Sequence, residues 1–507
     1  MLNIITKKTI TVAALVALGA APVSVLATNG MNLEGYGPEA TGMGGASMAW
    51  DNGSAAMMNN PATLGLMHEG ESRLDVAIGT LGPDIASDAP AGAAAFGATD
   101  ESSSSSLFIM PALGYVKRSG KVSYGFGVYS QGGMGTEYDN GAFMTGGAPF
   151  ASGETVRSEV GVGRFLVPLA YTVNENFTVG GSVDFVWAGM DLQMDVGGAQ
   201  FGDMVAALGG TQKFGSASGT MVQGFAGMIS GGMLDPDGPV NWARFDFSDD
   251  SDFTGSAGST GFGGKIGGTY KIGKLKLGGS YHSKTSLGDM KASDAEVSFS
   301  INGNDAGVGG APNGTINPAF TQKVAVSGEV KIKDFQWPEI IAFGAAYDVS
   351  DKLMIAADYK RIMWSKVMQD FNMSFVADAV QADPGAAAFG GAAMDMNLNQ
   401  DWEDQNVLLI GAAYKVSDPL TLRAGLNLAN NPVPDEYMNP LFPAIIKNHV
   451  TLGVGYVMSD VSNINFSLAY APPVSQTTDY GQSTPTGKGV EVTHSQTNSQ
   501  LMYSYVF

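Results

Sequence analysis

Residues 29–67 read NGMNLEGYGPEATGMGGASMAWDNGSAAMMNNPATLGLM. This stretch keeps no sustained period of 2 or 3.6 residues and is dense in Gly, Ala and Met, so it predicts compact irregular backbone with one short helix at most. With so few bulky side chains it cannot bury itself and needs a surrounding wall. We therefore expect a small plug inside a membrane β-barrel. On composition alone, a disordered N-terminal tail is the alternative.

Two residue types in this stretch favour close packing. Gly42, Gly44 and Gly45 permit close backbone approach or a positive φ. Pro61, which is followed by Ala62, directs Asn60 toward an extended conformation.

The first 27 residues have the pattern of a secretory signal peptide. Lys7 and Lys8 precede an apolar run over residues 10–21, and residues 25–27 form a small-residue cleavage site. The mature chain should begin near Thr28. A single membrane anchor is the alternative, but the run is shorter than the roughly 20 residues that a spanning helix needs.

Composition favours a transmembrane β-barrel. Hydrophobic residues make up 44% of the chain and charged residues 15%, yet no apolar run after residue 27 is long enough for a spanning helix. The 70 glycines and 22 prolines suit turns and long loops. A net charge of −21 argues against nucleic acid as a partner. The absence of cysteine excludes a lipoprotein anchor, disulfides and a thiolate metal site. A large soluble β-protein of the periplasm is the alternative.

Strand patterns recur after Glu71, separated alternately by short turns and long polar or Gly-rich loops. Six short turns and seven long loops predict about fourteen antiparallel strands, with the short turns in the periplasm. The short turns fall near residues 119–120, 174–176, 273–274, 350–351, 417–418 and 459–460. The long loops cover residues 83–106, 131–155, 196–257, 301–320, 375–400, 431–443 and 476–489.

Alternating side chains indicate which face of each strand meets lipid. One strand places apolar residues on one face and small or polar residues on the other: Phe177, Val179, Val183, Phe185 and Trp187 against Thr178, Gly180, Ser182 and Asp184. Because a barrel of this size has a polar or plugged interior, the apolar face should meet lipid. A soluble β-sandwich would instead bury that face against a second sheet.

Three motifs carry a family resemblance. The run from Gly35 to Ala46 (G-x-G-x-x-x-x-G-x-G-G-A), with the later N-P-A triplet, resembles the hatch of the FadL-type outer-membrane transporters for long-chain fatty acids and aromatic hydrocarbons. Residues 420–434 (LTLRAGLNLANNPVP) and 449–456 (HVTLGVGY) resemble the late-barrel pattern of that family. The final Phe507, behind alternating aromatics, resembles the signal that outer-membrane barrels present to their assembly machinery.

The resemblance implies a signal peptide at residues 1–27, a hatch at residues 28–70 and a barrel at residues 71–507. It also implies a location in the outer membrane of a Gram-negative bacterium, in contact with lipid and lipopolysaccharide. Its implied function is passive uptake of hydrophobic compounds, with no cofactor. Long-chain fatty acids are the expected substrates, and aromatic hydrocarbons or alkanes are the alternative. An adhesin or structural barrel is the alternative class, but it would need neither a plug nor an apolar lid.

The resemblance further implies capture at an extracellular loop, passage past the hatch and sideways exit through the barrel wall. Exit requires an inward kink, for which we expect Gly125 and Gly127 in the third strand, ahead of further glycines at Gly132, Gly133 and Gly135.

The loop over residues 196–257 contains its own helical pattern. Its apolar residues recur at helical spacing in two stripes, which are Phe201, Met204 and Leu208, and Met221, Phe225, Met228 and Ile229. Either these side chains pack together as a lid, or they form an adaptable apolar surface that captures a hydrophobic ligand.

Three cations are candidates to bind a substrate carboxylate. Strand parity directs Arg164 and Arg423 inward, and Lys360 is a third candidate in a strand that can contain a bulge. The alternative role for each is an ion pair with a lumen carboxylate such as Asp184 or Asp358.

Catalysis and metal binding find little support. The chain has four histidines, His68, His282, His449 and His494, and neither a G-x-S-x-G nor an H-E-x-x-H motif, so no enzyme is expected. The acidic cluster Asp246, Asp249, Asp250 and Asp252 has the oxygen ligands that Ca²⁺ prefers. We interpret it as a solvated loop, and no metal site is expected.

Overall fold

The computed structural model describes residues 29–89, 100–139, 152–249, 255–311, 313–478 and 489–507. The expected signal peptide, with its cleavage site at Ala27, lies outside these residues, as do Asp250 and Asp252. No helix in the described part of the chain is both long enough and apolar enough to span a membrane.

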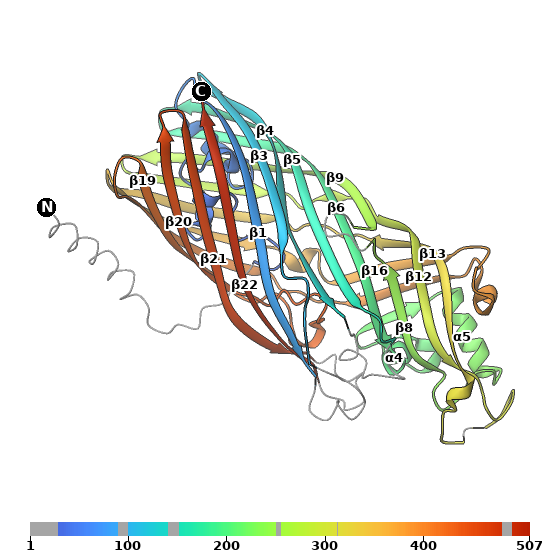
Figure 1. Ribbon diagram of the computed structural model, residues 1–507. Coiled ribbons are helices and arrows are strands. Elements are labelled where there is room, and N and C mark those ends of the chain that lie inside the picture. Colours follow the sequence, from blue (N-terminus) through green and yellow to red (C-terminus); the bar gives the residue numbers. More distant parts are fainter. Residues whose placement is uncertain (1–28, 90–99, 140–151, 250–254, 312, 479–488) are drawn as a thin grey trace.

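Antiparallel pairing closes the strands into a barrel (Figure 1). The last strand pairs with the first from Arg73↔Val506 to Asp88↔Glu491, which closes the ring. Within the described residues fourteen strands form this ring, in the order β1 (Ser72–Asp88), β3 (Phe108–Ser119), β4 (Val122–Tyr138), β5 (Val156–Asn174), β6 (Phe177–Gly197), β9 (Ala257–Ile272), β10 (Leu275–His282), β14 (Ile340–Ser350), β15 (Leu353–Ile362), β18 (Gln405–Lys415), β19 (Leu420–Ala429), β20 (Asn448–Ser459), β21 (Ser462–Thr477) and β22 (Glu491–Val506). The expected closed antiparallel barrel is confirmed.

Two further long strands, β12 (Met290–Asn302) and β13 (Thr321–Lys333), extend the wall beyond the ring. With them, sixteen strands rather than about fourteen build the barrel wall in the described residues. The difference arises because each of two expected strands is interrupted, at residues 283–289 and 334–339. Four shorter strands complete the extension, which lies far from the C-terminus in Figure 1: β7 (Gly215–Ser218), β8 (Val240–Phe247), β16 (Asp370–Ala377) and β17 (Ala393–Asn399). Two short strands instead pair with strands of the ring, β2 (Glu101–Ser102) with β1 and β11 (Ser286–Leu287) with β9.

The two faces of the wall differ as the alternation predicts. Val183 is 66% exposed on the outer face of β6, whereas the next residue, Asp184, is fully buried on the inner face. In the final strand Leu501, Tyr503 and Tyr505 are exposed, while Met502 and Ser504 between them are buried. All six expected short turns connect consecutive strands of the ring.

Residues 29–67 lie in the lumen, where they form the short helices α2 (Pro38–Thr41), η1 (Gly53–Met57) and η2 (Pro61–Leu66). Backbone N–H groups of this N-terminal segment donate hydrogen bonds to side chains on three separate strands. The Ser54 N–H bonds to Asp75 on β1, the Ser47 N–H to Asp358 on β15 and the Gly44 N–H to Thr451 on β20. On a fourth, β9, the Asn60 amide donates to the Gly268 carbonyl at 3.3 Å. A disordered tail does not fit these contacts.

The glycines and Asn60 act as the sequence predicts. Gly44 has φ +71°, and a Cβ there would lie 2.4 Å from the Leu426 carbonyl oxygen of the wall, so no larger residue fits. Asn60 is extended, with φ −136° and ψ 104°, and its side chain accepts the Ala62 N–H to cap the following helix.

Candidate substrate passage

The barrel wall is interrupted between β3 and β4. The two strands pair regularly from Ser119↔Val122 to Ala112↔Tyr129. Beyond Tyr129 the β4 strand bulges between Ser130 and Gly132, and Gly133 donates its N–H to the Met31 carbonyl at 3.1 Å. The second half of β4 therefore leaves β3 while it stays paired with β5, and at Gly132 it forms an isolated bridge with Asn32 of the N-terminal segment.

The bend lies beyond the two expected glycines. Gly125 and Gly127 pair with Val116 and Gly114 in the regular part of the ladder. The bend occurs at Gly132 instead, because its φ of +155° suits glycine and a Cβ would lie 2.2 Å from the Met31 oxygen.

The gap between the two strands is bounded at both ends, so we call it the window. At one end stands the Ala112↔Tyr129 pair. At the other, Ser104 donates its N–H to the Glu137 carbonyl at 2.8 Å, and Glu137 donates its own to the Ser103 hydroxyl at 3.0 Å. Between these points β3 and β4 share no backbone pair in the described residues.

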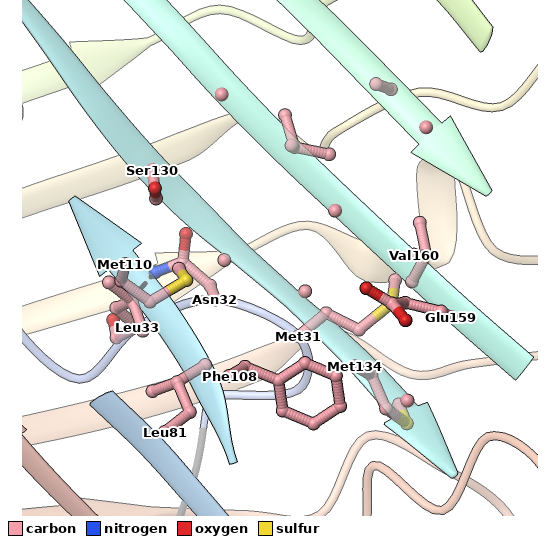
Figure 2. Close-up of a pocket in the computed structure, with 18 of the residues that line it drawn as sticks. Met31, Asn32, Leu33, Leu81, Phe108, Met110, Ser130, Met134, Glu159 and Val160 are labelled. Carbon is pink, nitrogen blue, oxygen red and sulfur yellow. Dashed lines mark hydrogen bonds between the residues drawn. The ribbon is translucent and has the colours of Figure 1, made fainter. Parts of the chain in front are cut away.

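A cavity of about 560 Å³ lies behind the window (Figure 2). Its lining is mainly apolar side chains and glycine backbone drawn from β1, β3, β4, β5, β6 and the N-terminal segment. The apolar side chains include Met31, Leu33, Leu81, Phe108, Met110, Met134 and Val160. We call this space the exit cavity.

A second, smaller cavity of about 20 Å³ adjoins the first. Met31 and Val160 line both, so these two side chains separate them. The remaining lining is rich in Met and Phe: Met190, Leu192, Met194, Phe335, Met368, Phe371, Leu398, Gln400, Asn439 and Phe442. We call this space the inner cavity.

Charged groups are sparse along both cavities. Glu159 lines the exit cavity and forms an ion pair with Arg157 at 2.8 Å. His494 also lines it, and its Nδ1 is 2.9 Å from the Pro443 carbonyl. No lysine or arginine among the described residues lines either cavity. The passage therefore offers mainly apolar surface, one carboxylate and a few uncharged polar side chains, which are Asn32, Ser130, His494 and Gln496 in the exit cavity and Gln400 and Asn439 in the inner cavity.

The three cations singled out by the sequence lie elsewhere. Arg164 forms an ion pair with Asp184 at 2.9 Å, and Lys265 pairs with the same carboxylate. Arg423 donates to the Asn465 side chain at 3.0 Å and lies 3.4 Å from the Glu39 carboxylate. For these two arginines the structure supports the ion-pair alternative.

Lys360 is buried and lines a small polar cavity of about 10 Å³ beside Tyr36 and His282. Neighbouring Asp358 instead accepts the N–H groups of Ser47 and Met48. The structure thus places all three cations outside the exit and inner cavities.

The apolar residues of the long loop pack against one another. They belong to α4 (Gly198–Met204), η4 (Ala206–Leu208) and α5 (Thr220–Ser230). Phe225 is 1% exposed, and its ring centroid lies 6.1 Å from that of Phe201 and 4.5 Å from that of Phe299 on β12. Met204 and Met221 are fully buried, and the rest pack partly buried against this cluster: Leu208, Met228 and Ile229. None of the seven lines either cavity.

Several residues that shape the passage could not be identified from the sequence. Residues 438–443, the end of the extracellular loop expected over residues 431–443, fold back against β4 and β5. The Leu441 carbonyl accepts the Thr136 hydroxyl at 3.0 Å and the Ser158 hydroxyl, and the Pro440 carbonyl accepts the Tyr138 hydroxyl. The prolines and asparagines of this loop indicate irregular backbone, but they do not indicate which strands the loop contacts.

No site for a metal ion is formed by three or more His, Cys, Asp or Glu side chains of the described residues.

A closed membrane barrel with a segment folded into its lumen and an apolar cavity behind a window defines a channel for hydrophobic solutes. The chain belongs to the family described as outer membrane protein transport protein (OMPP1/FadL/TodX), which matches residues 16–506. It is accordingly a β-barrel protein of the Gram-negative outer membrane, within a family of transport channels.

Solved structures of similar proteins agree with this assignment. The toluene transporter TodX of Pseudomonas putida is 27% identical, with a TM-score of 0.72, over 94% of this chain and 99% of that one. The toluene transporter TbuX of Ralstonia pickettii is 28% identical, with a TM-score of 0.68 and the same coverage. A FadL homologue of Pseudomonas aeruginosa, 16% identical with a TM-score of 0.60, shares the fold.

A curated relative is similar over a short stretch. An uncharacterized protein encoded in the 5′ region of the phosphoenolpyruvate carboxykinase gene of Chlorobium limicola is 56% identical over 77 residues. The match spans 15% of this chain and 37% of that protein.

Proposed function

We propose that this protein takes up uncharged hydrophobic compounds of the size of monoaromatic hydrocarbons and releases them sideways through the window into the bilayer. The observation that carries the proposal is the lining of the two cavities, which is apolar apart from a few polar groups and has no cation among the described residues. A volume of about 560 Å³ lies within the range of roughly 300–1,000 Å³ typical of small-molecule sites.

A neutral substrate fits this lining better than a fatty acid does. A buried carboxylate needs a cation or several hydrogen-bond donors, and without them the cost of removing it from water is high. In the exit cavity it would meet the Glu159 carboxylate instead. The likeness to two toluene transporters, each more than 25% identical, supports the same choice. Uncharged hydrocarbons, the alternative substrates of the sequence analysis, are therefore preferred over fatty acids.

The N-terminal segment is proposed to act as a hatch that blocks the direct route through the lumen. Its buried contacts with β1, β9, β15 and β20 support this role. A solute that enters beside Phe335 and Phe442 would pass Met31 and Val160 into the exit cavity. The flexible Met31 thioether can move aside at modest cost.

The test is uptake of radiolabelled toluene and oleate by a bacterium that lacks its own outer-membrane transporters of this kind. The bacterium would express this protein or its Val160→Trp variant, in which the junction of the cavities is filled. The matched control is Val183→Trp on the lipid-facing side of β6. All proteins should be compared at equal surface level.

We expect toluene uptake with the native protein and the Val183 control, and little uptake with Val160→Trp. Entry of oleate but not toluene would show that the substrate is a fatty acid and not an uncharged hydrocarbon. Equal toluene uptake by the two tryptophan variants would contradict the route.

A further inference from the structure

One side chain spans the window. Phe108, at the start of β3, faces inward, whereas its neighbour Ile109 is 46% exposed on the outer face. A Cβ added to Gly135 on β4 would lie 2.8 Å from Cζ and 3.1 Å from Cε1 of the Phe108 ring. The ring therefore covers Gly135 and connects the two strands where their backbones are unpaired (Figure 2).

The inward displacement of β4 makes this contact possible. After the bulge at Ser130–Gly132 the strand lies deeper than β3, so the bare backbone at Gly135 meets an inward-facing ring. The backbone contacts at Glu137 and at Tyr129 hold both ends of the window. Because the backbone is held at both ends, the width of the opening between β3 and β4 depends on the side chains that lie across it.

We propose that Phe108 sets the upper size of the compounds that leave through the window. This inference rests on the proposed function and adds a specificity-determining residue to it. The ring is held over Gly135 by van der Waals contact, which is weak for each pair of atoms, and the adjacent Met110 and Met134 are adaptable. A compound small enough to pass a displaced phenyl ring leaves, and a bulkier one does not.

The first test compares uptake of toluene and of the three-ring hydrocarbon phenanthrene. Phe108→Ala should raise the ratio of phenanthrene to toluene uptake several-fold, and Phe108→Trp should lower it. The matched control is Leu113→Ala, which removes an exposed apolar side chain from the same strand, lies outside both cavities and should leave the ratio unchanged.

The second test changes the side chain within one folded protein. Because the chain has no cysteine, Phe108→Cys introduces a single thiol. The free thiol should behave as Phe108→Ala does, benzyl methanethiosulfonate should return the uptake ratio toward the native value, and dithiothreitol should reverse that effect. Leu113→Cys, treated in the same way, should show no change.

The outcomes separate the two proposals. If native protein takes up toluene and neither the substitutions nor the thiol label alters the ratio, Phe108 does not set the size limit, while the proposed function stands. If the native protein takes up no toluene, the proposed function is wrong and this inference falls with it.

Discussion

At the scale of single residues, Glu159 and Glu137 form a natural comparison. Both carboxylates pair with Arg157, at 2.8 and 3.0 Å, but only Glu159 lines the exit cavity. Glu159→Gln removes the negative charge that a carboxylate substrate would meet there. We expect the ratio of decanoate to toluene uptake to rise in this variant and to stay unchanged in Glu137→Gln. The same ratio in both variants would show that Glu159 does not select against anions.

A second residue-scale prediction concerns stability. Asp184 is fully buried and neutralises two buried cations, Arg164 and Lys265. Asp184→Ala should lower the free energy of unfolding by about 3–5 kcal/mol, because it leaves buried charge without a partner. Asp348→Ala, which breaks the partly exposed pair with Lys276, should cost less than about 1 kcal/mol. Thermal unfolding in detergent, followed by circular dichroism, measures the difference. Equal midpoints would contradict it.

The sequence alone predicted part of the arrangement of charged side chains inside the barrel. The parity of the alternation placed Arg164 and Asp184 on the inner face and named the ion pair as one of two roles. The sequence could not decide between the roles, because the choice depends on which side chains border the passage. Those include Met31, Phe108 and Phe442, which lie in separate parts of the chain, Phe442 more than 300 residues beyond the other two.

At the scale of elements, the bend in β4 determines whether the window exists. Gly132→Ala should force β4 away from Met31, because the added Cβ has no room at a φ of +155°. We expect toluene uptake to fall while the barrel still reaches the surface. Gly268→Ala on β9 is the control, since this residue lines neither cavity and a Cβ there meets its nearest heavy atom at 3.7 Å, an ordinary contact distance. Undiminished uptake by Gly132→Ala would show that the bend is dispensable.

Local sequence predicted turns well and this bend only approximately. Each short turn is marked by Gly, Ser, Asp or Asn within two or three residues, and those signals are local. The bend lies five residues beyond Gly127, because its position depends on where Met31 docks. The expected loop over residues 301–320 does connect β12 and β13, but the breaks at residues 283–289 and 334–339 that separate this hairpin from the ring were missed, since the strand pattern continues across them.

At the scale of the whole molecule, the lumen segment and the wall should have separable roles. Deletion of residues 29–67 should leave a pore that admits small hydrophilic solutes, because the remaining lumen face is polar. Swelling of liposomes in arabinose measures this, with the full-length protein as the impermeable control and circular dichroism as a check on folding. A folded deletion variant that excludes arabinose would contradict the role of a hatch.

The seam between β1 and β22 has a consequence for how the molecule forms. It joins residues near the start of the wall to the last residues of the chain, and the Phe507 N–H donates to the Ser72 carbonyl at 2.9 Å. Contacts between such distant residues form late, because the entropy of closing the loop must be met before pairing contributes. Residues 29–67 precede the seam, so they must be in place when the final strand docks. Closure of the barrel therefore brings the last strand against the strand that directly follows the lumen segment, so both ends of the chain meet at one seam.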